Sequence, residues 1–400
     1  MALASNTALA TFNQVAGQFL DLSDILAELI RYDNTALLNR ITMDGVATET
    51  IHSWVEDGVA AITITAASAL ASASTGTIET ATALGGNIVV GAILKDAAAA
   101  GNALAELCQV TAVSASGTQV TLSRGYGGSS GTAHAASATW LVIATPAQED
   151  ADIPSDMSVA RTKVSNFTQV FLRGVKVSYS SQAILQAGVP SEFGHQVSYR
   201  LKELMRELDA SIINSYANGS VGTGSSSQYR SMGGLVQFAT GGSVGVSQVL
   251  STGATYTTAE VLTPDLLNTM ASAVWYRGGM TTGFFQGFLL VSGKQKRRIA
   301  QFDQAYRRMD YNQGSAGYTV EKFLSDLGFE FQIIVDPWMA DDTVVLGDLS
   351  RIKVMPLKGQ AMHVEDIAKT GRALKGMVTG EYTAEFRNAA NTTAIHVNLT

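Results

Sequence analysis

Apolar side chains recur at helical spacing over one long stretch of this chain, directly after Pro190. Spacings of three and four residues predict an amphipathic helix over 191–217, which would be about 40 Å long at 1.5 Å per residue. Asn218 and Gly219 would end it, since both residue types favour helix termination. The apolar positions are Phe193, Val197, Leu201, Leu204, Leu208 and Ile212.

The two faces of this predicted helix have different roles. Leu201, Leu204 and Leu208 fall on one face, and we expect that face to be buried. Charged residues three apart on the other side are expected to pair in solvent. The two predicted pairs are Arg200–Glu203 and Arg206–Asp209.

Three shorter helices carry end signals. Ser23 precedes an apolar pattern that includes Ile25 and Leu29, which predicts a short capped helix. A second helix should begin at Pro264 after the N-cap Thr263 and stop at Gly278-Gly279. A third follows the strand-like run "GFLLV", where Ser292 and Gln295 fit a capping box.

Short β-branched runs divided by Gly and Ser dominate residues 60–145, where few charges occur. Their regular spacing predicts a small all-β module. Further strands are expected at 48–65 and 164–178, over 320–355, and twice in "GEYTAEFRNAANTTAIHVNL" at the end. With the helices, this pattern predicts an α+β fold.

Composition narrows the class of protein. Charged residues make up only 15% of the 400 residues, the net charge is −7, and 46% of residues are hydrophobic. So few charges favour a chain that buries part of its surface by assembly. Cys108 is the single cysteine, so no disulfide can form within the chain. The N-terminus lacks a signal-peptide pattern and no stretch resembles a membrane helix, so we expect cytoplasmic synthesis and no membrane.

The stretch "LSRGYGGSSGTAH" at 122–134 raises the question of catalysis. Residues 127–131 fit the G-x-S-x-G pattern of a serine hydrolase, and so do residues 241–245. Neither match is followed by the helix that a nucleophile elbow requires, and the same absence argues against a dinucleotide loop. The five histidines are scattered and show no ligand spacing. We therefore predict no enzyme, no cofactor and no metal, and a structural turn at Arg124 and Tyr126.

One basic cluster stands out from this weakly charged background. Lys294, Lys296, Arg297 and Arg298 should lie at the start of a helix, where the macrodipole disfavours cations. The cluster is either a solvated helix face or a contact with an acidic partner surface or a nucleic acid backbone.

Several of these segments, in their order, resemble a branch of the tailed-bacteriophage major capsid proteins with the Hong Kong 97-type coat fold. "TETIHSWVEDGVAA", "VTLSRGYGGSSGTAHA", "VKVSYSSQAILQAG" and "VLGDLSRIKVMPLKG" carry the resemblance, with the closing strands. It implies an N-terminal arm at 1–40 and an extended loop at 41–160 with an inserted β module about 60–145. It also implies a peripheral domain at 161–217 and 350–400 with the spine helix 191–217, and an axial domain at 218–349.

The function implied is self-assembly into pentamers and hexamers that form an icosahedral head shell around double-stranded DNA. A scaffolding protein, a portal and the packaged DNA are the implied partners, with a decoration protein as an optional one, and assembly would occur in the host cytoplasm. Two alternatives remain: a serine hydrolase and an extracellular β-rich adhesin. Candidate inter-subunit contacts are Glu56, Asp57, Arg124, Tyr126, Glu149, Asp150, Asp152, Arg297 and Arg298.

The resemblance also raises the question of covalent cross-links. Some capsids of this fold join subunits by an isopeptide bond from a lysine on the extended loop. Here the only lysine between residues 41 and 162 is Lys95, inside the predicted module. We therefore expect no covalent cross-linking. The arm before residue 40 is also too short for a fused scaffolding domain, which implies a separate scaffold or one removed earlier.

Overall fold

A computed structural model describes residues 35–57, 63–71, 75–79, 88–97, 105–114, 118–149, 161–184, 189–217, 224–225, 228–240, 260–280, 285–302, 307–309, 320–368 and 371–400. The helix predicted after Ser23 lies outside these residues. The chain forms two compact units, a main unit made of residues up to 54 and from 164 onward, and an inserted unit of residues 55–163.

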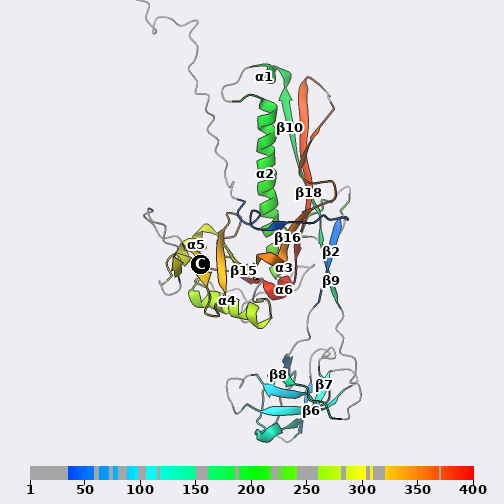
Figure 1. The fold of residues 1–400 in the computed structure, drawn as a ribbon, viewed down its shortest axis with the longest axis vertical. Helices are drawn as coiled ribbons and strands as arrows, with labels where there is room; N and C mark the ends of the chain where they lie inside the picture. Colours follow the sequence, from blue (N-terminus) through cyan, green and yellow to red (C-terminus); the bar gives the residue numbers. More distant parts are fainter. Residues whose placement is uncertain are drawn as a thin grey trace, which may run out of the picture. The chain divides into compact units, whose positions relative to one another are not determined.

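The long helix of the main unit, α2 (Glu192–Asn214), lies along a long strand pair (Figure 1). β18 (Ala373–Phe386) pairs antiparallel with β10 (Gln169–Ser178) over ten positions. β18 continues into pairing with β16 (Ile352–Pro356), whose other edge takes β1 (Thr42–Met43), and β17 (His363–Asp366) also pairs with β18. This five-stranded first sheet buries its apolar face under α2.

The structure confirms the predicted long helix as α2, although the helix ends earlier, at Asn214. Ser191 caps its start by accepting from Gly194 N at 3.3 Å. The helix ends at Asn214 rather than 217 because the Ser215 carbonyl accepts from Gly234 N at 2.6 Å instead of continuing the helical ladder. A Cβ on Gly234 would lie 2.8 Å from the Ser211 oxygen, so only glycine fits this close approach.

Burial along α2 corrects two expectations. Leu204 and Leu208 are fully buried, as predicted, but Leu201 is 39% exposed because the helix packs closely only along its C-terminal half. The Arg200–Glu203 pair forms at 2.6 Å. Asp209, which we expected in an exposed pair with Arg206, is fully buried and accepts from Leu38 N.

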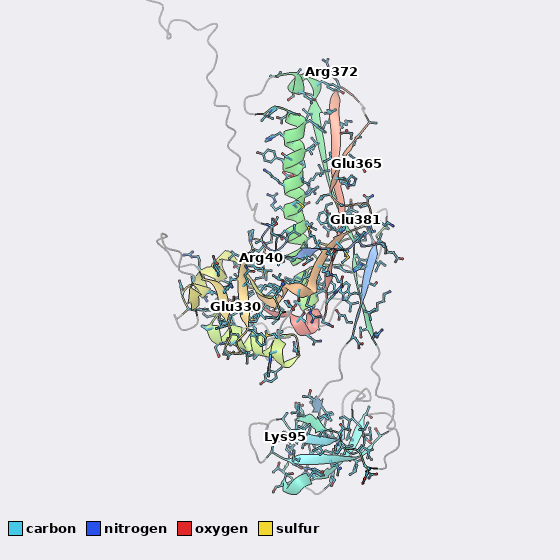
Figure 2. All side chains as sticks on the ribbon, viewed as in Figure 1. Arg40, Lys95, Glu330, Glu365, Arg372 and Glu381 are labelled. Carbon is cyan, nitrogen blue, oxygen red and sulfur yellow. The ribbon has the colours of Figure 1, made fainter. Side chains whose placement is uncertain are left out.

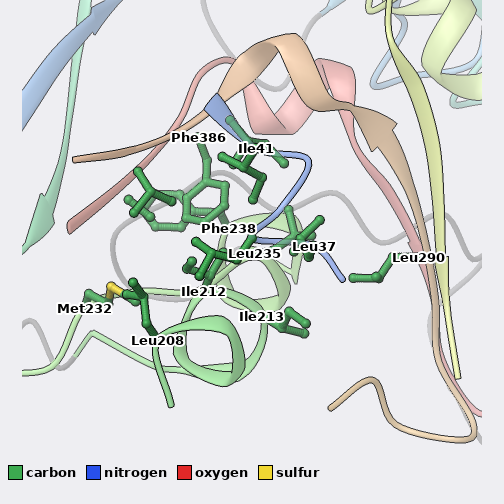
Figure 3. Packing of buried hydrophobic residues seen from close by; sticks show 14 of the residues in the cluster. Leu37, Ile41, Leu208, Ile212, Ile213, Met232, Leu235, Phe238, Leu290 and Phe386 are labelled. Atoms are coloured by element: carbon green, nitrogen blue, oxygen red, sulfur yellow. The ribbon is translucent and has the colours of Figure 1, made fainter. Parts of the chain in front are cut away.

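The main core forms around the C-terminal half of α2 (Figure 3). Leu37 and Ile41, which precede the first strand, are buried there beside α3 (Leu235–Thr240) and strands of both sheets. The boundary expected between an arm and a loop at residue 40 falls between the buried residues Leu38 and Ile41, while Arg40 itself is exposed. The buried members shown in Figure 3 include Leu208, Ile212, Ile213, Met232, Leu235, Phe238, Leu290 and Phe386.

A second, six-stranded sheet builds the other part of the main unit. Its order is β12 (Arg307–Met309), β13 (Val320–Leu324), β14 (Glu330–Val335), β11 (Gly287–Val291), β15 (Val344–Asp348) and β19 (Ala394–His396). Only β11 and β14 run parallel to each other. The strand pairing changes the expected layout, because β19 joins this sheet although residues 350–400 were assigned to the other domain. α3 packs in the main core, together with α2 and with residues of the second sheet such as Leu290 and Val345.

Helix α4 (Pro264–Tyr276) covers this sheet and has the predicted ends. Thr263 accepts from Leu266 N at 3.2 Å, and Gly278 adopts a positive φ of 75°. The following Gly279 could carry no side chain, because a Cβ would lie 2.0 Å from the Asn391 oxygen. α4 and the sheet share a second core, which includes Leu267, Met270, Leu289, Phe331, Ile333 and Leu346.

Helix α5 (Gly293–Ile299) forms only half of its predicted capping box. Ser292 accepts from Gln295 N at 3.5 Å, but Gln295 is buried and donates from Nε2 to the Asp341 carbonyl at 2.7 Å. The helix is short, with 7 residues. Lys296, Arg297 and Arg298 therefore lie in its last turn, where the macrodipole favours cations, and not at its start.

The inserted unit is the predicted β module. Its sheet runs β3 (Thr63–Thr65), β8 (Thr139–Ala144), β5 (Ile93–Asp96), β6 (Leu107–Val113), β7 (Gln119–Arg124) and β4 (Thr75–Glu79), antiparallel throughout. It has its own core, centred on Trp140, Leu94 and Leu122. The chain enters and leaves through β2 (Ile51–Glu56) and β9 (Thr162–Phe167), which pair with each other. The remaining short helices are α1 (Tyr179–Ala183) and α6 (Ala389–Thr392).

Two leucines three residues apart on α2 provide a matched stability test. Leu204→Ala should lower the free energy of unfolding by about 2–5 kcal/mol, because it leaves a cavity in the main core. Leu201→Ala removes the same atoms from a partly exposed position and should cost less than about 1 kcal/mol. Urea unfolding of each full-length variant measures both values. Equal losses for the two variants would contradict the packing of α2 described above.

Candidate functional site

The glycine-rich stretch after β7 forms a tight turn, as predicted. Gly125, Gly127 and Gly128 have φ angles of 72°, 66° and 86°, a region that residues with a Cβ rarely adopt. A Cβ on Gly125 would also lie 2.9 Å from the Ser129 carbonyl oxygen. Tyr126 begins the single 3₁₀ turn between these glycines and is 38% exposed. Glycine is therefore required at these positions by the backbone conformation of the turn.

Arg124, at the end of β7, anchors the turn to the module from inside. Its guanidinium donates two hydrogen bonds to the Glu106 carboxylate, from Nε to Oε1 at 2.7 Å and from Nη2 to Oε2 at 2.6 Å. It also donates to the carbonyls of Ala71 and Thr132. The side chain has no exposed surface, so its hydrogen bonds are made within the subunit. The inter-subunit contact expected of Arg124 stays a prediction.

Glu106 is the centre of this buried network. Its Oε2 also accepts from Thr132 N at 3.0 Å and lies 2.8 Å from His134 Nε2, while His134 Nδ1 lies 3.5 Å from Asp96. Burial alone would raise the pKa of Glu106, but hydrogen bonds from Arg124 and His134 outweigh it and lower the pKa to about 2. The carboxylate therefore stays charged and fully bonded at neutral pH.

The geometry does not support a serine nucleophile at this turn. Ser129 Oγ accepts from Leu107 N at 3.0 Å and lies 2.9 Å from the Tyr126 carbonyl, so its bonds go to the backbone. His134, the nearest histidine in sequence, is bonded to Glu106 instead. Burial raises the pKa of the neighbouring Cys108 thiol to about 12, which makes it a poor nucleophile. The second G-x-S-x-G match, at 241–245, lies outside the described residues.

The other predicted contact residues occupy several surfaces. On the strands that lead to the module, Glu56 is half-buried, and Asp57 is exposed and pairs with Arg161 at 3.4 Å. Glu149 is exposed, whereas Asp150 and Asp152 lie outside the described residues. On α5, Arg297 is exposed and Arg298 is half-buried. Within each unit, Glu56 and Asp57 are neighbours at the end of β2, and Arg297 and Arg298 are neighbours on α5.

Sequence reasoning missed two buried acidic features. Glu106 was counted only as one of few charges in the module, although the strand pattern around it predicts an inward position. Asp209 sits directly after Leu208 and before Ile212, so the helical period itself places it at the edge of the apolar face. Its partner, Asp336, is distant in sequence and no local pattern connects the two.

Within the part of the chain that the structure describes, no group of three or more His, Cys, Asp or Glu side chains could hold a metal ion. No helix there is both long and apolar enough to span a membrane.

The buried Glu106 network gives a pH prediction for the module. Because the folded-state pKa of Glu106 is depressed from 4.5 to about 2, the stabilisation is complete above pH 4.5 and is lost as the pH falls towards 2. Cys108, the single cysteine and fully buried, reports module opening. Its labelling by a pyridyl disulfide, which reacts in acid, should accelerate over this pH range.

Glu106→Gln provides the control, because it leaves the Arg124 charge buried without its partner, which costs about 3–5 kcal/mol. This variant should label faster than the unmodified chain at pH 7 and lose most of the additional acid step. Protection of Cys108 that persists to pH 2, or a Glu106→Gln variant as protected as the parent at pH 7, would contradict the role given to Glu106.

Comparison with known proteins agrees with the fold. The structure is similar to the capsid of an empty GTA particle computed with C5 symmetry, with a TM-score of 0.52 and 11% identity over 99% of this chain and 100% of that chain. It also matches a chain of Microbacterium phage Oxtober96, with a TM-score of 0.47 and 11% identity over 98% and 100% of the two chains. No curated protein matches the sequence.

The mixed α+β architecture is that of phage capsid proteins of the Hong Kong 97 type, as the sequence predicted. The family model described as SU10 major capsid protein matches residues 4–400. The chain therefore belongs to the SU10 major capsid protein family, and its role is structural, as a capsid-forming protein of a bacteriophage virion.

Proposed function

We propose that this protein assembles into rings of five and six copies, which close into an icosahedral shell around double-stranded DNA. The observation that carries the proposal is the family match over residues 4–400. The C5 symmetry of the GTA capsid, which has a similar fold, supports five-membered rings. Head-to-tail contacts between identical copies produce closed rings when the rotation between neighbours closes.

The two sheets of the main unit suit the two roles that such a shell requires. In this proposal the first sheet with α2 is the peripheral domain, and the second sheet with α4 and α5 is the axial domain that surrounds the ring centre. β2 and β9 are the two arms of an extended loop that reaches a neighbouring subunit, with the β module carried on it. Support comes from the separate core of the module, which lets it fold without contributing to the main core.

The same proposal includes partners and a place of assembly. A scaffolding protein and a portal act during assembly in the host cytoplasm, and a decoration protein is an optional addition to the finished shell. The packaged DNA is held by sequence-independent contacts with its phosphates. Lys294 and Arg297 on α5 are basic and exposed. They could bind the acidic surface of a neighbouring subunit or the phosphates of DNA. The protein has no enzymatic activity in this scheme.

Electron microscopy of the purified full-length protein tests the function. Uniform shells, or rings of five and six subunits, are the expected result. A monodisperse monomer under every condition of concentration, salt and added scaffold would contradict the proposal. Labelling of Ser129 or Ser243 by a serine-reactive phosphonate would instead favour the hydrolase.

Charge reversal on the loop arm tests the proposed contact between subunits. Glu56 and Asp57 lie at the end of β2, and we propose that they meet basic residues of a neighbour, with Arg297 and Arg298 as candidates. The double variant Glu56→Lys, Asp57→Lys should reduce the yield of shells several-fold, because like charges would then face each other. The subunit should remain folded, since Asp57 is exposed, Glu56 is only half-buried, and substitutions at such positions change stability little. Sedimentation measures the yield.

A second variant distinguishes the loss of the proposed contact between subunits from the loss of the Asp57–Arg161 pair inside the subunit. Adding Arg161→Glu to the double variant restores an opposite-charge pair within the loop. The exposed pair itself is worth at most about 1 kcal/mol. If the contact is between subunits, this triple variant should still assemble poorly. Rescue of assembly, or an unchanged yield in the double variant, would refute the proposed contact.

The lysine distribution predicts shells without covalent cross-links. Lys95, the only lysine between residues 41 and 162, lies on β5 of the module and is half-buried (Figure 2). An isopeptide bond needs a lysine ammonium that reaches a partner amide. The arm segments at about 47–60 and 144–158 contain no lysine, and the first lysine after them is Lys163 on β9. Mature shells boiled in detergent should therefore migrate as monomer on a gel. A ladder of covalent oligomers would show this prediction to be wrong.

A further inference from the structure

Two aspartates meet in the main core where α2, β14 and the segment 35–41 come together. Asp209 on α2 and Asp336, directly after β14, are both 0% exposed. Asp209 Oδ1 accepts from Leu38 N at 2.8 Å, and Asp336 Oδ1 accepts from Trp338 N at 2.9 Å. Asp336 also accepts a hydrogen bond from the backbone of Leu37. The amide of Leu37 therefore bonds to Asp336, and the next amide, that of Leu38, bonds to Asp209.

The remaining oxygens of this carboxyl pair have no ordinary donor. Oδ2 of Asp209 and Oδ2 of Asp336 are both buried without a hydrogen-bond partner among the described residues. The two carboxyl groups nevertheless lie close enough to shift each other's pKa, as a hydrogen bond between them would. Two ionised carboxylates can only accept, so such a bond needs one proton between them. A single proton would satisfy both unpaired oxygens.

The surroundings offer little to stabilise two negative charges. Arg40 in the segment donates to the Ala36 carbonyl, and Glu207 on α2 pairs with Arg173. Arg206 lies one turn before Asp209 on α2. The strand β11, whose Val291 carbonyl accepts from Asp336 N at 3.1 Å, has no titratable side chain. On the loop after Asp336, the nearest acids are Asp341 and Asp342, which add negative charge.

Burial is the main influence on how the pair titrates. Burial, with a smaller contribution from the charge of Asp336, raises the pKa of Asp209 to about 8, although the hydrogen bond from Leu38 opposes the change. Burial also raises the pKa of Asp336, against the bonds from Trp338 and Asp209. Because the titrations are coupled, the upper value belongs to the pair. One proton is therefore retained at neutral pH.

We infer that the Asp209–Asp336 pair is a proton-binding site that fastens the segment 35–41 to α2 and to the second sheet, and that releases the segment when the proton leaves. On release, the O–H bond at Oδ2 breaks and the proton passes to hydroxide or to a buffer base. Two adjacent carboxylates then remain in a dry site, where their repulsion is poorly screened. The inference concerns the subunit itself and holds whether or not the proposed shell forms.

The direction of the pH effect follows from linkage. A carboxyl whose folded-state pKa is raised holds a proton that the opened state has lost, so the closed state is favoured at low pH. Its stability relative to the opened state falls as the pH rises from the ordinary aspartate value of 3.8 and levels off above about 8. The segment should therefore open in alkali, in contrast with the module, which opens in acid.

Hydrogen exchange at the Leu38 amide of the full-length protein tests the site. After correction for intrinsic chemistry, the opening constant should rise about tenfold per pH unit between about pH 5 and pH 8. Asp209→Asn supplies a permanent N–H donor at the same position, so exchange at Leu38 should be nearly independent of pH. Glu207→Gln, on the exposed side of the same helix, is the matched control and should behave like the parent.

A second measurement remains informative if Asp209→Asn folds poorly. Infrared difference spectra of the parent across this pH range should show the carbonyl band of a protonated carboxylic acid disappearing in alkali, and Asp336→Asn should lack that band. A flat exchange profile in the parent, an unchanged pH dependence in a folded Asp209→Asn variant, or the absence of the acid band would each overturn the inference.

Discussion

The burial of the C-terminal half of α2 is the interaction on which the main unit depends. Leu204, Leu208 and Ile212 are fully buried there, against β18 of the first sheet, α3 and the segment 35–41. These elements come from opposite ends of the chain, so the helix is the surface on which distant segments meet. At about 1.5–3 kcal/mol for each large side chain, their burial is large compared with a net stability of about 5–15 kcal/mol. The exposed Leu201 shows how sharply this contact ends along the helix.

The inserted unit follows a different principle, because it depends on polar groups as well as on its small core. A six-stranded sheet of short strands buries few large side chains, and Trp140 is the largest. The Glu106–Arg124 pair adds a directional constraint that joins β6 and β7 to the loop at Thr132. Breaking such a pair destabilises strongly even where its net contribution is modest, since it leaves one charge buried alone. The pair therefore fixes which turn conformation the glycines adopt.

Local signals explain why much of the fold could be predicted from the sequence. α4 was predicted with both ends because Thr263, Pro264 and Gly278 each act on the backbone within a few residues. The module strands were predicted because their β-branched runs are separated by glycine. The second-sheet position of β19, the early end of α2 at Asn214 and the burial of Asp209 could not be predicted. Each depends on a partner distant in sequence, respectively β15, Gly234 and Asp336.

At the candidate site too, features set by local signals could be predicted and features set by residues distant in sequence could not. The glycine turn was correctly identified as structural because positive φ angles are a local requirement. The buried partner of Arg124 could not be predicted, because a basic residue beside an exposed turn gives no sign of an acid eighteen positions earlier in sequence, directly before a neighbouring strand. Contacts between subunits are harder still, since their partners lie on another copy of the chain. Asp57, Glu149 and Arg297 are exposed on the subunit surface.

The two buried acidic sites give the units opposite responses to pH, and this difference has a physical cause. Glu106 has an arginine partner, so burial strengthens the ion pair and the carboxylate keeps its charge. Asp209 has another aspartate as its partner, so burial favours the protonated form. An apolar pair at Asp209 and Asp336 would pack without this penalty but could not bind the amides of Leu37 and Leu38. Those amides belong to a segment with no regular structure of its own, and buried backbone donors need acceptors. The acids therefore supply the hydrogen bonds that let an irregular segment enter the core.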